Sequence, residues 1–152
     1  MGEFFGSLYT SLFENFFGLD LANYLWGQTS QSGINLYIGI GLWLLGISLA
    51  VAIIFYYVID HPKLNNWWGW LIFTGINAII NFIVGLEWTL TDLYAGKMEQ
   101  LDPKTNQWVD MNITSSDCIC FGVTNAILSI VIFFIISMII KWKSKSVSHA
   151  PF

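Results

Sequence analysis

Three long apolar stretches constrain the fold of this chain more than any other feature. They cover residues 34–58, 67–88 and 119–140. A helix needs about 20 consecutive, mostly apolar residues to cross the hydrocarbon core of a bilayer, and each stretch is long enough. Within that core every backbone polar group must be bonded inside the protein, which an α-helix achieves by itself. The stretches therefore predict an all-α integral membrane protein with three transmembrane helices.

The composition limits what else the chain can contain. Only 11% of its 152 residues are charged, whereas a soluble domain has about 25%. We expect one membrane domain, residues 34–140, between an N-terminal segment, residues 1–33, and a short basic tail, residues 141–152. The chain has no arginine and a net charge of −4. A nucleic-acid partner is therefore not expected, because its phosphates require a basic surface.

Apolar residues recur at helical spacing in the N-terminal segment, and polar residues fill the opposite side. The apolar positions are Phe4, Phe5, Leu8, Tyr9, Leu12, Phe13, Phe16 and Phe17. This pattern predicts an amphipathic helix that ends at Gly18. A second short helical turn over residues 21–26 is expected to follow, with Asp20 as its N-cap and Gly27 at its end. We expect the first helix to lie in the membrane interface. The alternative is that its aromatic face packs against the spans or against a partner.

The connections between the spans differ in length. Residues 60–66 form a short turn, so the first two spans are expected to form an antiparallel helical hairpin. Residues 89–118 form the only sizeable extramembrane loop, and this loop is acidic. Within it, residues 98–101 and 107–111 flank a segment that contains Pro103 and Asn106, which are residues typical of tight turns. A small β-hairpin-like loop is therefore predicted between the second and third spans.

The distribution of lysines predicts the orientation. Basic residues near the ends of spans stay on the cytoplasmic side of a membrane. With three spans, the turn over residues 60–66 and the C-terminal tail lie on the same side, and that side carries four lysines: Lys63, Lys141, Lys143 and Lys145. The other side carries Lys97 and Lys104. We therefore expect the N-terminus outside and the C-terminus in the cytoplasm.

The first span contains a stripe of small residues, Gly39, Gly46 and Ala50. Small residues let helices approach one another closely in lipid. The stripe predicts a helix-packing face, although it does not specify the partner.

The sequence contains no catalytic signature. There is no HExxH motif, no P-loop and no GxGxxG motif. Cys118 and Cys120 are too close in the sequence for an ordinary structural disulfide, and we expect small buried thiols. An enzyme is therefore not expected, and neither a cofactor nor a metal site is predicted.

Polar residues inside the spans are the remaining candidates for function. Asn77 and Asn81 lie one helical turn apart on the second span, with Thr74 on the same stripe. The third span carries Asn125 and Ser129. One interpretation is a helix-contact seam in which these side chains bond to one another. The other is a water-filled path in a homo-oligomer.

Two acidic residues extend the second interpretation. Glu87 and Asp92 lie near the outer end of the second span, where in an oligomer they would form an acidic mouth that favours cations. Otherwise Glu87 is a solvated acid at the end of a helix.

These features support two functional hypotheses. The first is a non-catalytic membrane subunit or anchor of an oligomeric or multi-protein assembly. The alternative is a small homo-oligomeric ion channel or pore, cation-preferring and lined by the polar face of the second span. A transporter ranks last, because neither an inverted repeat nor a broken helix is evident. The expected partners are the lipid bilayer and either further copies of the chain or other membrane subunits.

Overall fold

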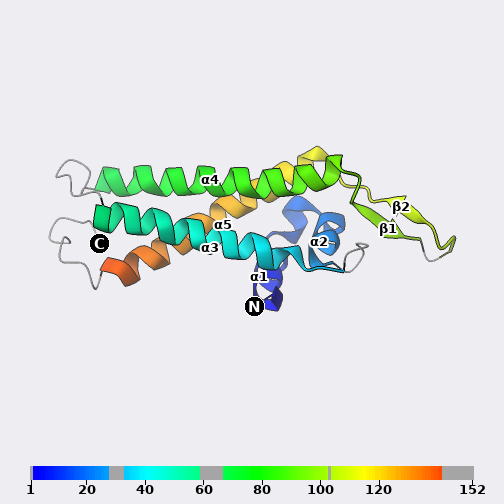
Figure 1. Ribbon diagram of the computed structural model, residues 1–152, viewed down its shortest axis with the longest axis horizontal. Helices are drawn as coiled ribbons and strands as arrows, with labels where there is room; N and C mark the ends of the chain where they lie inside the picture. Colours follow the sequence, from blue (N-terminus) through cyan, green and yellow to red (C-terminus); the bar gives the residue numbers. More distant parts are fainter. Residues whose placement is uncertain (1, 28–32, 59–66, 103, 142–152) are drawn as a thin grey trace. The chain divides into compact units, whose positions relative to one another are not determined.

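The computed structural model describes residues 2–27, 33–58, 67–102 and 104–141 (Figure 1). The protein is mostly helical, with one small antiparallel sheet. The elements are α1 (Gly2–Phe17), α2 (Leu19–Trp26), α3 (Leu36–Ile53) with its π-helical continuation η1 (Ile54–Val58), α4 (Trp67–Tyr94), β1 (Glu99–Leu101), β2 (Trp108–Asp110) and α5 (Ser115–Lys141). The predicted turn over residues 60–66 and, beyond Lys141, the basic tail lie outside the described residues.

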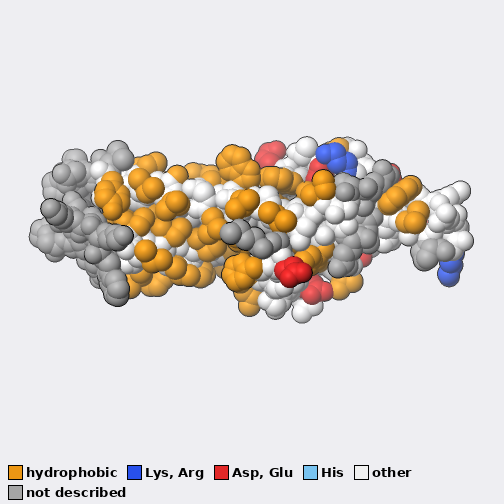
Figure 2. Space-filling model, turned by 60° about the horizontal axis from the view of Figure 1, so that its bottom comes forward, with side chains coloured by type: hydrophobic (Ala, Val, Ile, Leu, Met, Phe, Trp, Pro, Cys, Tyr) orange, Lys and Arg blue, Asp and Glu red, His pale blue; other side chains and the backbone are white. Residues whose placement is uncertain are grey.

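Among the described residues, three helices are long and apolar enough to cross a membrane, which confirms the three predicted spans. They cover Leu36–Tyr57, Trp67–Tyr94 and Ser115–Ile140. On the face visible in Figure 2, hydrophobic side chains cover much of the helical surface. Outside a bilayer such a surface would be a large exposed apolar patch, so the protein is membrane-embedded.

Two of the helices extend beyond the predicted spans. Helix α4 continues to Tyr94 instead of ending at residue 88, and α5 begins at Ser115 instead of residue 119. Hydrogen bonds at α5 explain its earlier start, because the Asp117 carboxylate accepts bonds from both the backbone N–H and the hydroxyl of Thr114, at 2.8 and 2.9 Å. This arrangement is half of a capping box. The loop predicted over residues 89–118 is therefore shorter than expected.

The chain forms two compact units, and each of the three long helices passes from one unit into the other. The first unit contains residues 1–42 and 83–124, and the second contains residues 43–82 and 125–152. Each unit has its own buried core.

The core of the first unit is aromatic. The Tyr9 ring stacks on Tyr37 and on Phe121, with ring centroids 5.3 and 5.5 Å apart. Phe17 meets Phe121 edge-on at 5.4 Å, and Trp26 meets Tyr37 edge-on at 5.7 Å. The face of α1 that carries Tyr9 and Phe17 thus packs against α3 and α5, as the alternative placement of the N-terminal helix required.

The short helix α2 begins earlier than predicted. Its N-cap is Gly18, at a φ of 91°, and Asp20 lies inside the first turn. The predicted capping role of Asp20 is therefore wrong, because the chain resumes helical geometry directly after the glycine. Gly27 ends the helix in the left-handed conformation, at a φ of 75°, as expected.

The predicted hairpin is confirmed. Strands β1 and β2 pair antiparallel, with Leu101 opposite Trp108 and Glu99 opposite Asp110. Asn106 has a φ of 54°, a value that asparagine tolerates better than most residues. The Asp102 carboxylate accepts bonds from the Lys104 N–H and from the Thr105 hydroxyl, both at 2.9 Å. These bonds favour the ionised form and lower the pKa of Asp102 below its usual value.

Candidate functional site

The predicted polar residues of α4 and α5 lie together in the second unit. Asn77, Asn81, Asn125 and Ser129 each have 0% of their surface exposed. Two hydrogen bonds join the helices. The Asn77 side-chain N–H donates to the Ser129 carbonyl at 3.1 Å, and the Asn125 side-chain N–H donates to the Asn81 carbonyl at 2.6 Å. We call these four residues the polar seam.

Other bonds of the polar seam stay within one helix. The Asn81 side-chain N–H donates to both the backbone and the side-chain oxygen of Asn77, at 2.9 and 3.2 Å. The Ser129 hydroxyl donates to the Ala126 carbonyl at 2.7 Å. Thr74 is also buried, and its hydroxyl donates to the Trp70 carbonyl at 2.8 Å. Most of the polar atoms that the sequence placed on one stripe are thus bonded inside a single copy of the chain.

Beyond the polar seam, α4 and α5 share a mainly apolar contact. The Trp70 indole N–H donates to the Ser137 hydroxyl at 3.4 Å, and the Trp70 ring lies 6.0 Å from the Phe133 ring. Both rings belong to a buried cluster with Val51, Ala52 and Phe55 of the first span. The second unit therefore has an apolar core that adjoins a polar one.

Two buried polar atoms of this unit have no hydrogen-bond partner among the described residues, namely the Asn81 side-chain oxygen and the Ser48 hydroxyl. Ser48 was missed by the sequence reasoning. The signal available was a single hydroxyl near the middle of an otherwise apolar span. Ser48 lies seven residues before Phe55, and Asn77 lies seven residues after Trp70. Because Phe55 and Trp70 share one cluster and the two spans are antiparallel, Ser48 and Asn77 lie near the same level.

The two acids proposed for an outer mouth have different surroundings in the first unit. Glu87 is exposed. Asp92 is 8% exposed and forms an ion pair with Lys97 at 2.8 Å. Burial, and to a lesser extent the nearby Asp92 carboxylate, raises the pKa of Tyr24 in α2 well above its usual value. Asp92 is thus already engaged with neighbours in its own chain.

The stripe of small residues on α3 is used only in part. A Cβ atom on Gly39 would lie 3.1 Å from the Trp88 ring, so Gly39 allows a close approach within the first unit. Gly46 and Ala50 are exposed, and apart from its two chain neighbours and the backbone of its own helix, no described atom lies within 4 Å of a Cβ built on Gly46.

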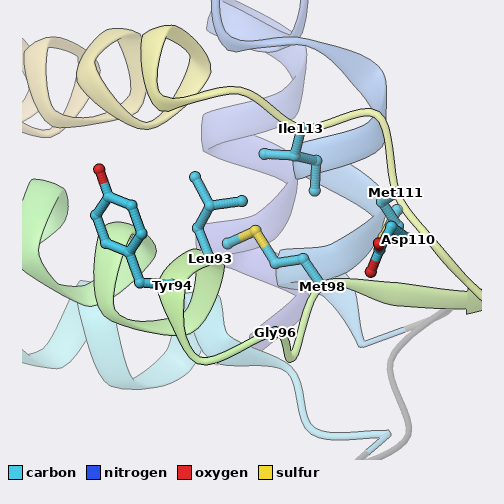
Figure 3. A pocket seen from close by; sticks show the side chains of 7 residues that line it. All are labelled: Leu93, Tyr94, Gly96, Met98, Asp110, Met111 and Ile113. Atoms are coloured by element: carbon cyan, nitrogen blue, oxygen red, sulfur yellow. The ribbon is translucent and has the colours of Figure 1, made fainter.

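A cavity of about 350 Å³ lies between the end of α4 and the hairpin (Figure 3). The residues that line it include Leu93, Tyr94, Met98, Asp110, Met111 and Ile113. Among the described residues no cluster of His, Cys, Asp and Glu side chains could hold a metal ion. Cys118 is buried and Cys120 is half-buried, and both are free thiols.

Comparisons of the chain with protein-family models, with curated proteins and with solved structures found no match. The geometry of the polar seam consists of two hydrogen bonds between α4 and α5, made by fully buried side chains.

Proposed function

We propose that this protein is a non-catalytic membrane subunit or anchor of an oligomeric or multi-protein assembly. The observation that carries the proposal is the burial of the polar seam. An amide in hydrocarbon needs a partner, and Asn77 and Asn125 donate their side-chain N–H groups to the facing helix of the same copy. A helix whose polar face is used internally can present an apolar surface to lipid or to other membrane helices.

The hairpin supplies a surface for contact outside the membrane. Leu101, Trp108 and Val109 are 46%, 44% and 48% exposed. Exposed aromatic side chains are enriched at protein interfaces, and the acidic residues around them favour a partner with basic groups. These residues extend the proposed contact region beyond the spans.

The native mass of the protein in mild detergent, with the identity of everything bound to it, tests the proposal. We expect stoichiometric association with other membrane polypeptides or with further copies of the chain. Trp108→Ala should weaken that association without lowering the yield of folded protein, whereas Lys104→Ala serves as an exposed control on the same hairpin. A lone, monodisperse protomer would contradict the proposal.

We also propose that the N-terminus lies outside and the C-terminus in the cytoplasm. The support is the excess of lysines on the C-terminal side of the spans. With Cys120→Ser in both variants and the buried Cys118 retained, a membrane-impermeant thiol reagent applied to intact cells should label a cysteine introduced at Lys104. A cysteine introduced at Lys145 should react only after the membrane is opened. The reverse pattern would contradict this orientation.

The alternative is a small homo-oligomeric, cation-preferring pore lined by the polar face of α4. One observation favours it, because the Asn81 side-chain oxygen and the Ser48 hydroxyl are buried without a partner and would be stabilised by water. Reconstituted protein should then conduct ions, and Asn81→Leu should abolish the current. The absence of conductance from well-folded oligomers would exclude the pore.

A further inference from the structure

Helix α1 carries two neighbouring apolar stripes, and only one of them is used by the core. Residues four apart lie on one side of a helix. Phe5, Tyr9 and Phe17 belong to the inner stripe and are 4%, 0% and 0% exposed. The adjacent stripe contains Phe4, Leu8, Leu12 and Phe16, and we call it the outer stripe.

The outer stripe is largely uncovered. Phe4 is 66% exposed, Leu12 is 61% exposed and Phe16 is 51% exposed. In water, three large apolar side chains in one row would be unfavourable, because each leaves much of its apolar area hydrated. The outer stripe is therefore expected to contact either an apolar medium or a partner.

The contacts of the inner stripe show at which depth α1 is held. The Phe5 ring lies against Gly41 of α3, so closely that a Cβ on Gly41 would be 2.5 Å from it. Gly41 lies inside the apolar span that begins at Leu36. At about 1.5 Å per residue, this position is about 8 Å past the start of the span.

The second contact indicates the same depth. The Tyr9 ring stacks on Phe121, which lies within the apolar part of α5. Amphipathic helices of membrane interfaces bury their apolar faces about 5–10 Å into the boundary between headgroups and acyl chains. The anchoring of α1 on Gly41 and Phe121 therefore places the outer stripe at the level of acyl chains.

The charge of α1 limits which lipids can recruit it. The side of the helix opposite the inner stripe carries Glu3, Ser7, Ser11 and Asn15, and residues 1–33 contain no lysine or arginine. Attraction to anionic headgroups requires such basic residues. The helix must therefore be held by apolar contact alone.

From these observations we propose that α1 is a lipid-inserted helix. The outer stripe lies among the acyl chains of the leaflet at the hairpin end of the spans, and it binds them irrespective of headgroup charge. This inference does not depend on the proposed function, because an anchor and a pore could each carry such a helix.

A pair of nitroxide-labelled variants of the full chain tests the proposal. Leu12→Cys labels the outer stripe, and Ser11→Cys labels the polar side one residue away. Both are made with Cys120→Ser, while Cys118 is retained because it is buried. The proteins are reconstituted in phosphatidylcholine vesicles. Collision with oxygen reports exposure to acyl chains, and collision with a water-soluble nickel chelate reports exposure to water.

We expect the ratio of oxygen to nickel collisions to be several-fold higher at position 12 than at position 11. Anionic lipid added to the vesicles should leave both ratios unchanged. Phe16→Cys and Asn15→Cys repeat the comparison if the first pair does not fold. Equal ratios at the paired positions would overturn the proposal, as would a label at position 12 that neither reagent reaches, since a protein would then cover the stripe. Insertion only in anionic vesicles would also overturn it.

Discussion

Gly41 is the position at which the packing of α1 can be tested most directly. Alanine at this position would place its Cβ 2.5 Å from Phe5 Cγ, and 2.6 and 2.8 Å from the two neighbouring ring atoms. Carbon atoms pack best at about 3.5–4.0 Å, so the ring must retreat by roughly 1 Å. Phe5 is 4% exposed and has little room to move. Overpacking of this kind typically costs about 1–3 kcal/mol.

The cost falls on the docking of α1, since α3 stays helical whether or not α1 is bound. The greater helix preference of alanine over glycine therefore does not offset it. An increase of about 1–3 kcal/mol in the free energy of the docked state corresponds to about a 5- to 150-fold rise in the undocked population. Gly41→Ala should accelerate hydrogen–deuterium exchange of the α1 amides by that factor. Amides in the middle of α4 should exchange at the original rate.

Gly46→Ala is the matched control on the same helix. No described atom outside its chain neighbours and the backbone of its own helix lies within 4 Å of a Cβ at Gly46, so this variant should leave α1 exchange unchanged. Combining Phe5→Leu with Gly41→Ala should remove much of the clash, and residues in contact show coupling energies of about 0.5–3 kcal/mol. If both alanine variants changed α1 exchange equally, or if neither did, the close approach of Phe5 to Gly41 would be refuted.

Three further predictions concern the polar seam, the hairpin and the start of α5. Asn125→Leu removes a hydrogen bond between α4 and α5. Such bonds contribute about 0.6 kcal/mol on average and at most about 1.7 kcal/mol in a membrane protein. The unfolding free energy measured in mixed micelles should therefore fall by about 0.6–1.7 kcal/mol. Ionised Asp102 holds the hairpin turn, and its hydrogen bonds keep its pKa below the usual aspartate value in the folded protein, so the turn should loosen as the pH falls through that lowered pKa. The amide chemical shift of Lys104 should report this change, and Asp102→Asn should abolish its pH dependence. Asp117→Ala removes the acceptor of both Thr114 bonds and should lower the unfolding free energy by about 1 kcal/mol.

The three spans and the hairpin could be predicted because each has a local cause. Apolar length predicts a spanning helix, and a proline and an asparagine between two short arms predict a turn. The ends of the spans were less predictable. Helix α5 begins four residues early because Thr114 and Asp117 bond to each other, and such a cap is easily overlooked beside a hydropathy signal.

The packing of α1 needed the structure. The sequence showed one broad aromatic face on α1. In the structure, one part of that face is buried against the other helices and the other part is exposed. Phe4 and Phe5 are adjacent in the sequence, yet they are 66% and 4% exposed. Phe5 packs against Gly41, which is far away in the sequence and whose missing side chain leaves room for the Phe5 ring. Hydrophobic periodicity cannot show which of two neighbouring stripes meets such a glycine.

The hydrogen bonds of the polar seam allow the free-energy cost of a pore to be compared with that of a sealed helix contact. To line a path between copies of the chain, the side chains of Asn77 and Asn125 would have to leave their carbonyl partners on the facing helix. The exchange is not costly if water replaces those partners, because a bond between helices is worth only about 0.6 kcal/mol on average. It is costly if the path is dry, since a buried donor without a partner costs about 1–3 kcal/mol. A pore therefore requires continuous hydration along α4, whereas the sealed arrangement leaves only the Asn81 side-chain oxygen and the Ser48 hydroxyl of this unit without a partner among the described residues. Conductance and its loss in Asn81→Leu thus test whether water reaches the seam.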